Sequence, residues 1–149
     1  MRAPYDPSDR AAVFARYDTA IVHPELRKQI DAAMKEGSYD TAVRTAAILV
    51  ETKLRGTCLK HGCTTAKSAA GAKLADLAYE PSQGCLEPPY ALAIQARKGA
   101  QELFRGFFRY IRNAFGHNAI VVSTNARNVV ELVALCEALL MIIRASKKR

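Results

Sequence analysis

The apolar residues of this chain recur mostly at the spacing of amphipathic helices. Between Ser38 and Gly62, six apolar residues fall on one helical face: Ala42, Val43, Ala46, Leu49, Val50 and Leu54. Ser38 is a suitable N-cap and Gly62 a suitable stop, so we expect one long helix between them. The segment before it starts with Pro24, which suits a first helical turn, and ends at Gly37. A second, shorter helix is therefore expected there.

The middle of the chain alternates between helical pattern and breaker residues. Residues 63–70 are a loop of small residues, and residues 71–80 have the pattern of a short helix. Residues 81–90 contain three prolines and a glycine, which indicates a break in regular structure. A fourth, long helix is expected from about residue 91 to about residue 115.

The last helix is the most apolar part of the chain. We expect Ser123 or Thr124 to cap it, and residues 129–143 are apolar nearly all round. Such a helix is buried on several sides. The pattern as a whole predicts an all-α bundle of four or five helices.

The two ends depart from this pattern. Residues 1–22 hold two prolines and mixed charge and are expected to form an N-terminal arm, with one helical domain over residues 23–146. Residues 147–149 are a basic tail, for which a solvated end and a contact with nucleic acid both stay open. The formal charge of +8 makes a polyanion a candidate partner.

The composition also indicates a compartment. The first residues lack the apolar segment of a signal peptide, and no apolar stretch is long enough to span a bilayer. We therefore expect a cytoplasmic protein without membrane contact, whose cysteines are thiols: Cys58, Cys63, Cys85 and Cys136. The spacing of the first three with His61 is not a usual zinc pattern, so we expect no metal site.

The sequence RYIRNAFGHN, residues 109–118, ends the fourth helix. At 100° per residue, five apolar side chains of this helix share the core face: Phe104, Phe107, Phe108, Ile111 and Phe115. Arg105, Arg109 and Arg112 fall together on the flank, where like charges repel by a few tenths of a kcal/mol per pair. An anionic ligand would explain this cluster.

Asn113 and His117 are four residues apart and point away from the core, beside Arg112. Arginine binds phosphate with a planar fork of donors, and histidine exchanges protons near neutral pH. Cleavage of a phosphodiester next to a ribose needs this set of groups and no metal or other cofactor. The alternative is a surface pair in which His117 is favoured by the nearby helix C-terminus.

These residues carry a family resemblance. The segment RNAFGH resembles the Arg-x(4–6)-His motif of the HEPN superfamily, in which a polar residue, often Asn, follows the arginine. The segment YDTAVRTAAILVETKLRG resembles the Tyr-x-x-Ala-Val…Glu-x-x-x-Arg helix of the Ymh-type branch. The resemblance covers roughly residues 24–145. Many members have proline where this chain has Ala114.

The resemblance implies an α-helical HEPN domain, usually a dimer in which two motifs face each other across a cleft. Many members are metal-independent endoribonucleases that act as toxins or in defence against phage and leave 2′,3′-cyclic phosphate ends. Others have lost activity and serve as binding or scaffold domains. Arg112 and His117 match the motif pair, and Asn113 matches the polar follower.

Further residues are candidates beside the motif. We expect Arg105, Arg109 and Tyr110 to contact RNA, although packing is the alternative for the tyrosine. Glu51 and Arg55 are spaced for an ion pair within one helix. They form either a structural salt bridge or a support that orients the motif residues.

Two functions of different classes follow. The first is a homodimeric endoribonuclease that cuts RNA with Arg112 and His117. The second is a catalytically silent helical module that binds nucleic acid within a complex with an antitoxin or defence-system partner protein. The complete Arg-Asn…His set favours the first, since a scaffold does not need an exposed pair of this kind. A DNA-binding helix-turn-helix fits less well, because no recognition helix follows a short turn.

Overall fold

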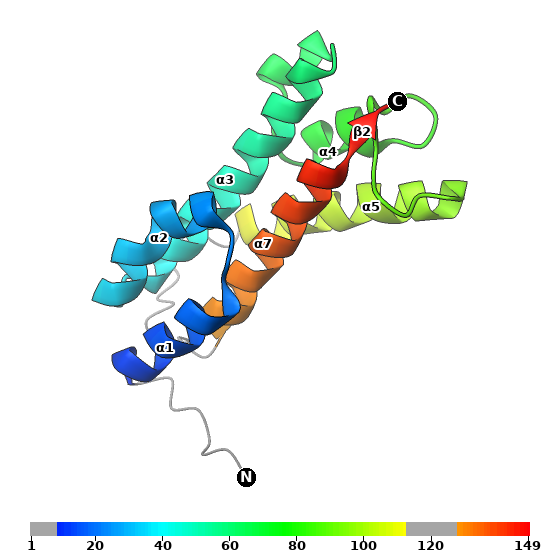
Figure 1. Cartoon of the computed structure of the whole chain (residues 1–149). Coiled ribbons are helices and arrows are strands. Elements are labelled where there is room, and N and C mark those ends of the chain that lie inside the picture. The colour runs from blue at the N-terminus through cyan, green and yellow to red at the C-terminus, as the bar shows by residue number, and fades with distance from the viewer. Residues whose placement is uncertain (1–8, 113–127) are drawn as a thin grey trace.

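The computed structural model describes residues 9–112 and 128–149, and it is an all-α bundle (Figure 1). Its α-helices are α1 (Arg10–Ala20), α2 (Pro24–Glu36), α3 (Tyr39–Lys60), α4 (Gly71–Tyr79), α5 (Ile94–Phe107) and α7 (Val129–Ala145). Shorter elements are the 3-10 helix η1 (Thr64–Ser68), the π-helical segment η2 (Phe108–Arg112), and the strands β1 (Leu86–Glu87) and β2 (Lys147–Lys148). The expected fold class is confirmed.

Helices α3 and α7 form the centre of the bundle and lie side by side (Figure 1). All six residues of the predicted apolar face of α3 are buried. Helix α2 packs along one side of α3, and α4 packs against α3 and against α5. Gly37 ends α2 in a left-handed conformation, with φ 74°, as its position predicts. Ser38 occupies the N-cap of α3, but its side chain makes no capping hydrogen bond.

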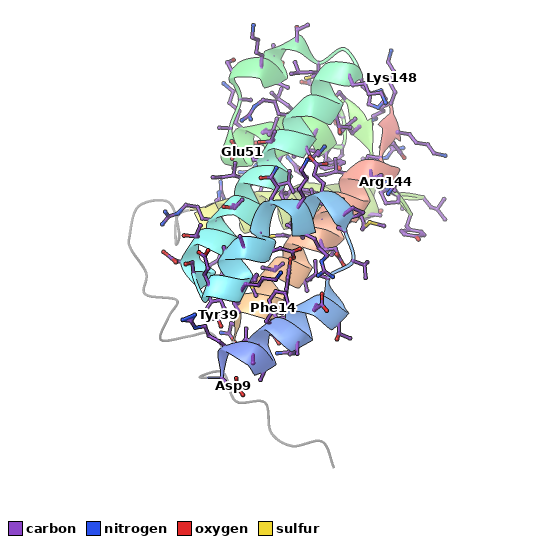
Figure 2. The ribbon with its side chains drawn as sticks, turned by 60° about the vertical axis from the view of Figure 1, so that its left-hand side comes forward. Asp9, Phe14, Tyr39, Glu51, Arg144 and Lys148 are labelled. Carbon is purple, nitrogen blue, oxygen red and sulfur yellow. The ribbon has the colours of Figure 1, made fainter. Side chains whose placement is uncertain are left out.

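The expected arm over residues 1–22 is wrong for its described part, because Arg10–Ala20 form a helix. The Asp9 carboxylate, at the start of α1 in Figure 2, accepts hydrogen bonds from the backbone N–H groups of Ala11 (2.9 Å) and Ala12. Val13 and Tyr17 lie one helical turn apart and are fully buried against the bundle. The Tyr17 hydroxyl also donates to Asp31 of α2 at 2.5 Å. This apolar pair and the cap stabilise the helix in spite of the charged residues around it.

A carboxylate of α7 holds the turn between α1 and α2. Glu137 accepts hydrogen bonds from the backbone N–H groups of Val22 and His23, each at 2.8 Å. His23 is the N-cap of α2, and its Nδ1 accepts from the N–H of Leu26 at 3.2 Å. His23 therefore caps the start of α2.

The last helix is buried on several sides, as expected. Six of its large apolar residues are at most 3% exposed: Val129, Val130, Val133, Leu139, Leu140 and Ile143. The opposite side stays apolar and open to solvent, with Leu135 and Met141 exposed. The caps expected at Ser123 and Thr124 lie outside the described residues.

The basic tail is exposed, and its backbone is paired with another part of the chain. Lys147–Lys148 pair in antiparallel fashion with Leu86–Glu87. The backbone N–H of Arg149 donates to the Cys85 carbonyl at 3.1 Å, and its guanidinium donates to the carbonyls of Glu80 and Pro81. The pairing was not predicted, because it joins residues about 60 positions apart in sequence, which a local pattern does not reveal.

Within the described ranges, no helix is both long and apolar enough to cross a membrane.

Candidate functional site

Helix α5 corresponds to the fourth helix expected from the sequence. It is shorter than predicted, and the segment that continues it is not α-helical. Helix α5 begins at Ile94, after the Pro88–Pro89 pair, and residues Phe108–Arg112 continue it as a π-helical segment. The wider π turn rotates the residues that follow it relative to an ideal α-helix. Such segments are often found at functional sites.

The aromatic face of this region is the core face that the pattern predicts. Phe104, Phe107, Phe108 and Ile111 are at most 5% exposed. Phe104 stacks at a tilt on Tyr79 of α4, with ring centroids 4.9 Å apart. The π-helical segment packs against α3 and α4, so the start of the motif is anchored on the bundle. Phe115 lies outside the described residues.

The motif begins at the end of this anchored segment. Arg112 is the last residue of the π helix, and its side chain lies outside the description. Asn113 and His117 belong to residues 113–127, which are also outside the described ranges. Their assignment to catalysis stays a prediction.

The arginines before the motif have different environments. Arg105 is half-buried and its guanidinium pairs with Asp76 of α4 at 2.8 Å, and the same carboxylate accepts from Gln101 at 2.7 Å. Arg109 and Tyr110 are exposed on the π-helical segment, with Tyr110 72% exposed. The Asp76 carboxylate already neutralises the positive charge of Arg105. The two exposed side chains are therefore the better candidates for RNA contact.

Glu51 and Arg55 form the ion pair that their spacing predicts. The guanidinium of Arg55 lies 2.8 Å from the Glu51 carboxylate and also donates to the Ala69 carbonyl at 3.0 Å. Arg55 therefore ties the loop before α4 to α3. A role of this pair in orienting Arg112 or His117 stays a prediction, because those side chains are not described.

Tyr39 is only 5% exposed and belongs to the core.

An exposed face of α5 that contains two glycines was not predicted from the sequence. It consists of Ala96, Gly99, Leu103 and Gly106, at steps of three, four and three, and we call it the α5 seam. A Cβ atom added at Gly99 or Gly106 would have no heavy atom within 4 Å, so nothing within the described chain requires glycine there. Each glycine costs a helix about 1 kcal/mol relative to alanine. The sequence reasoning missed the seam because it followed the phenylalanine face of the same helix.

The cysteines are free thiols in the structure. Cys58 is buried beside Cys85, and this burial raises the pKa of its thiol. Among the described residues, no group of three or more His, Cys, Asp and Glu side chains is arranged to hold a metal ion.

Comparison with known proteins adds one family. The family model described as "Protein of unknown function (Hypoth_ymh)" matches residues 20–143, which is most of the chain. No curated protein and no solved structure matches the chain.

Proposed function

We propose that this chain, a member of the Hypoth_ymh family, is a metal-independent endoribonuclease of toxin or anti-phage type. The observation that carries the proposal is the position of the Arg112-Asn113…His117 motif, which starts at the last residue of the anchored π-helical segment. The exposed Arg109 and Tyr110 precede it on the same segment and supply a cation and an aromatic face for RNA.

The proposed reaction is a transesterification within RNA. The ribose 2′-oxygen attacks the adjacent phosphorus after losing its proton to a base, and the bond from phosphorus to the 5′-oxygen breaks. The leaving oxygen takes up a proton, and the other product ends in a 2′,3′-cyclic phosphate. His117 supplies the proton-transfer chemistry, while Arg112 stabilises the charge that builds up on the phosphorane. Asn113 donates a hydrogen bond to the same phosphate.

The proposal includes a dimer, and the α5 seam supports it. Gly99 and Gly106 have no side chain, so a second helix can approach this face of α5 closely. Two copies of α5 that run in the same direction place Gly99 opposite the partner's Gly99 and Leu103 opposite the partner's Leu103. Both motifs then lie at the same end of the pair. In an antiparallel pair centred on the seam, the two copies of Arg112 would be about 33 Å apart, at about 1.5 Å per residue.

The decisive experiment follows RNA cleavage directly. Purified protein is incubated with total RNA and with tRNA, with and without EDTA, beside the His117→Ala variant. We expect wild-type cleavage that EDTA does not inhibit, products with cyclic phosphate ends, and a loss of roughly 100- to 10,000-fold in the variant. Lys28→Ala, at an exposed position of α2, is the control for a surface substitution and should cut like wild type.

The outcomes separate the two functional classes. Cleavage of the same sequence made as DNA would contradict the mechanism, because DNA lacks the 2′-hydroxyl. Unchanged cleavage by a folded His117→Ala protein would show that His117 does not take part in the reaction. RNA binding without any cleavage would favour the silent binding module.

A further inference from the structure

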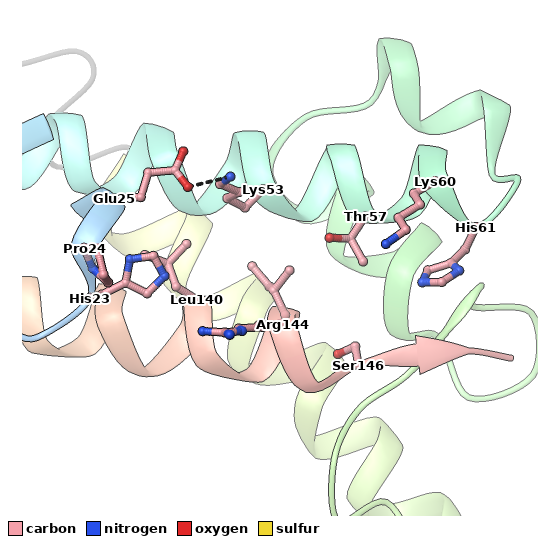
Figure 3. A pocket seen from close by; sticks show the side chains of 11 residues that line it. His23, Pro24, Glu25, Lys53, Thr57, Lys60, His61, Leu140, Arg144 and Ser146 are labelled. Carbon is pink, nitrogen blue, oxygen red and sulfur yellow. Dashed lines mark ion pairs between the residues drawn. The ribbon is translucent and has the colours of Figure 1, made fainter. Parts of the chain in front are cut away.

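A groove of about 490 Å³ lies between α3 and α7, next to the start of α2 (Figure 3). None of its lining residues belongs to the Arg112–His117 motif. Its size is within the range of small-molecule sites in proteins. The groove is thus a separate candidate for ligand binding.

The groove carries an excess of positive charge. Its cations are Lys53 and Lys60 of α3 and Arg144 of α7, and Glu25 is the only carboxylate among the lining residues that the structure describes. The Glu25 carboxylate is engaged by Lys53 at 2.6 Å (dashed in Figure 3). In the described part of the chain, neither Lys60 nor Arg144 has a carboxylate partner. Two positive charges therefore border one half-enclosed space, and they favour an anion in it.

Further hydrogen-bond donors line both ends of the groove. Figure 3 shows Arg144 extending along the groove towards His23, while Thr57, Lys60 and His61 gather at the other end. The Nδ1 atom of His23 already accepts a hydrogen bond from the N–H of Leu26, so its Nε2 is the atom left for a ligand. Donors at both ends suit a ligand with more than one anionic oxygen.

The groove also has an apolar part. Leu140 and Ile143 of α7 line it and are each 3% exposed, and Pro24 lines it from α2. Ser146, at the edge, already uses its hydroxyl with Tyr79 (2.8 Å) and with the Ile142 carbonyl. A ligand with a phosphate and a flat or apolar portion would match this lining better than inorganic phosphate alone.

We propose that this groove between α3 and α7 binds a phosphorylated small molecule of nucleotide size. Lys60 and Arg144 bind the phosphate groups from opposite walls, and Thr57 and the two histidines donate to its remaining oxygens. Leu140 and Ile143 contact the non-phosphate portion. This site goes beyond the proposed ribonuclease activity and does not depend on it.

The test is calorimetric titration of the full chain with ADP, inorganic pyrophosphate and adenosine at fixed ionic strength. We expect saturable binding of ADP, weaker binding of pyrophosphate and none of adenosine. Lys60→Ala and Arg144→Ala should each weaken ADP binding about tenfold, because each removes a charge-assisted hydrogen bond. Lys28→Ala and Lys98→Ala change the net charge equally at exposed positions outside the groove and should leave the affinity unchanged.

Several results would overturn the proposal. One is the absence of saturable binding by any of the three probes, with folding verified by circular dichroism. Another is an equal loss in the control lysine variants, which would show non-specific charge attraction. A third is a single-stranded RNA 12-mer that binds and loses affinity in Lys60→Ala and Arg144→Ala while ADP does not bind. The groove would then be part of an RNA surface.

Discussion

At the scale of single residues, Arg112 is the sharpest test of how phosphate is recognised. Arg112→Lys keeps the positive charge but loses the planar fork of donors, so cleavage should fall without vanishing. Arg112→Ala should lower both cleavage and RNA affinity further. Cleavage rates and RNA affinities of the two variants check this. Equal activity of Arg112→Lys and wild type would show that charge alone matters.

Arg105 and Arg109 should behave differently although both were expected to bind RNA. Arg109 is exposed, so Arg109→Ala should weaken RNA binding and reduce its salt dependence without a change in stability. Arg105 pairs with Asp76, so Arg105→Ala should lower the free energy of unfolding by at most about 1 kcal/mol and leave RNA affinity nearly unchanged. Filter-binding and urea unfolding measure the two quantities. A loss of RNA affinity in Arg105→Ala, with no such loss in Arg109→Ala, would show that Arg105 contacts RNA.

At the scale of elements, the α5 seam predicts opposite effects on folding and on association. Gly99→Ala should stabilise the isolated chain by about 1 kcal/mol, because alanine is the better helix former. The same substitution should weaken the dimer, because the added methyl separates the two helices. Thermal melting of the dilute protein and light scattering at micromolar concentration measure the two effects.

A disulfide tests the direction of the paired helices. In parallel pairing, Leu103→Cys places two thiols opposite each other and should cross-link the dimer under oxidation, whereas Lys98→Cys on the outer side of α5 should not. Both variants would carry Cys63→Ser and Cys85→Ser. Light scattering of the parent protein should give close to twice the 16.3 kDa chain mass. A monomer that still cuts RNA would contradict the composite cleft and leave the catalytic pair standing.

The elements also show how far the sequence leads. The helices α2, α3 and α4 could be predicted because their apolar faces and their glycine or proline boundaries are local signals. Helix α1 was missed because only Val13 and Tyr17 mark its buried side among charged residues. The π-helical segment could not be foreseen, since the same residues suit an α-helix equally well.

The candidate site was only partly predictable for a related reason. The sequence identifies the motif residues by type and order, and it places the phenylalanines in the core. The partner of Arg105 lies on another helix, 29 positions earlier in the chain, and the groove between α3 and α7 joins residues from three elements. Such contacts depend on the packing of helices and not on local spacing.

At the scale of the whole molecule, buried thiols make the fold sensitive to alkali. Cys136 is fully buried in α7, and burial raises the pKa of its thiol from the ordinary 9.0 to about 12. Above pH 9 the unfolded thiol releases its proton while the folded thiol keeps it, so stability falls as the pH rises towards 12. At pH 10 this one group is expected to lower the free energy of unfolding by about 1 kcal/mol.

Urea unfolding at pH 8 and pH 10 measures this loss. Cys136→Ala lacks the titrating group and should lose less stability between the two pH values than wild type does. An equal loss in both proteins would assign the alkaline sensitivity to other groups, such as the buried Cys58, whose thiol pKa burial also raises.

The packing of α3 against α7 has a consequence for folding during translation. The apolar face of α3 is complete at Lys60, yet α7, which covers one side of it, begins about 70 residues later at Val129. Helix α2 can cover one side of α3 early, but the side that α7 covers stays exposed while the residues between α3 and α7 are translated. At about 5–20 residues per second this interval lasts several seconds. During that time a chaperone that binds exposed apolar segments could bind the side of α3 that α7 later covers.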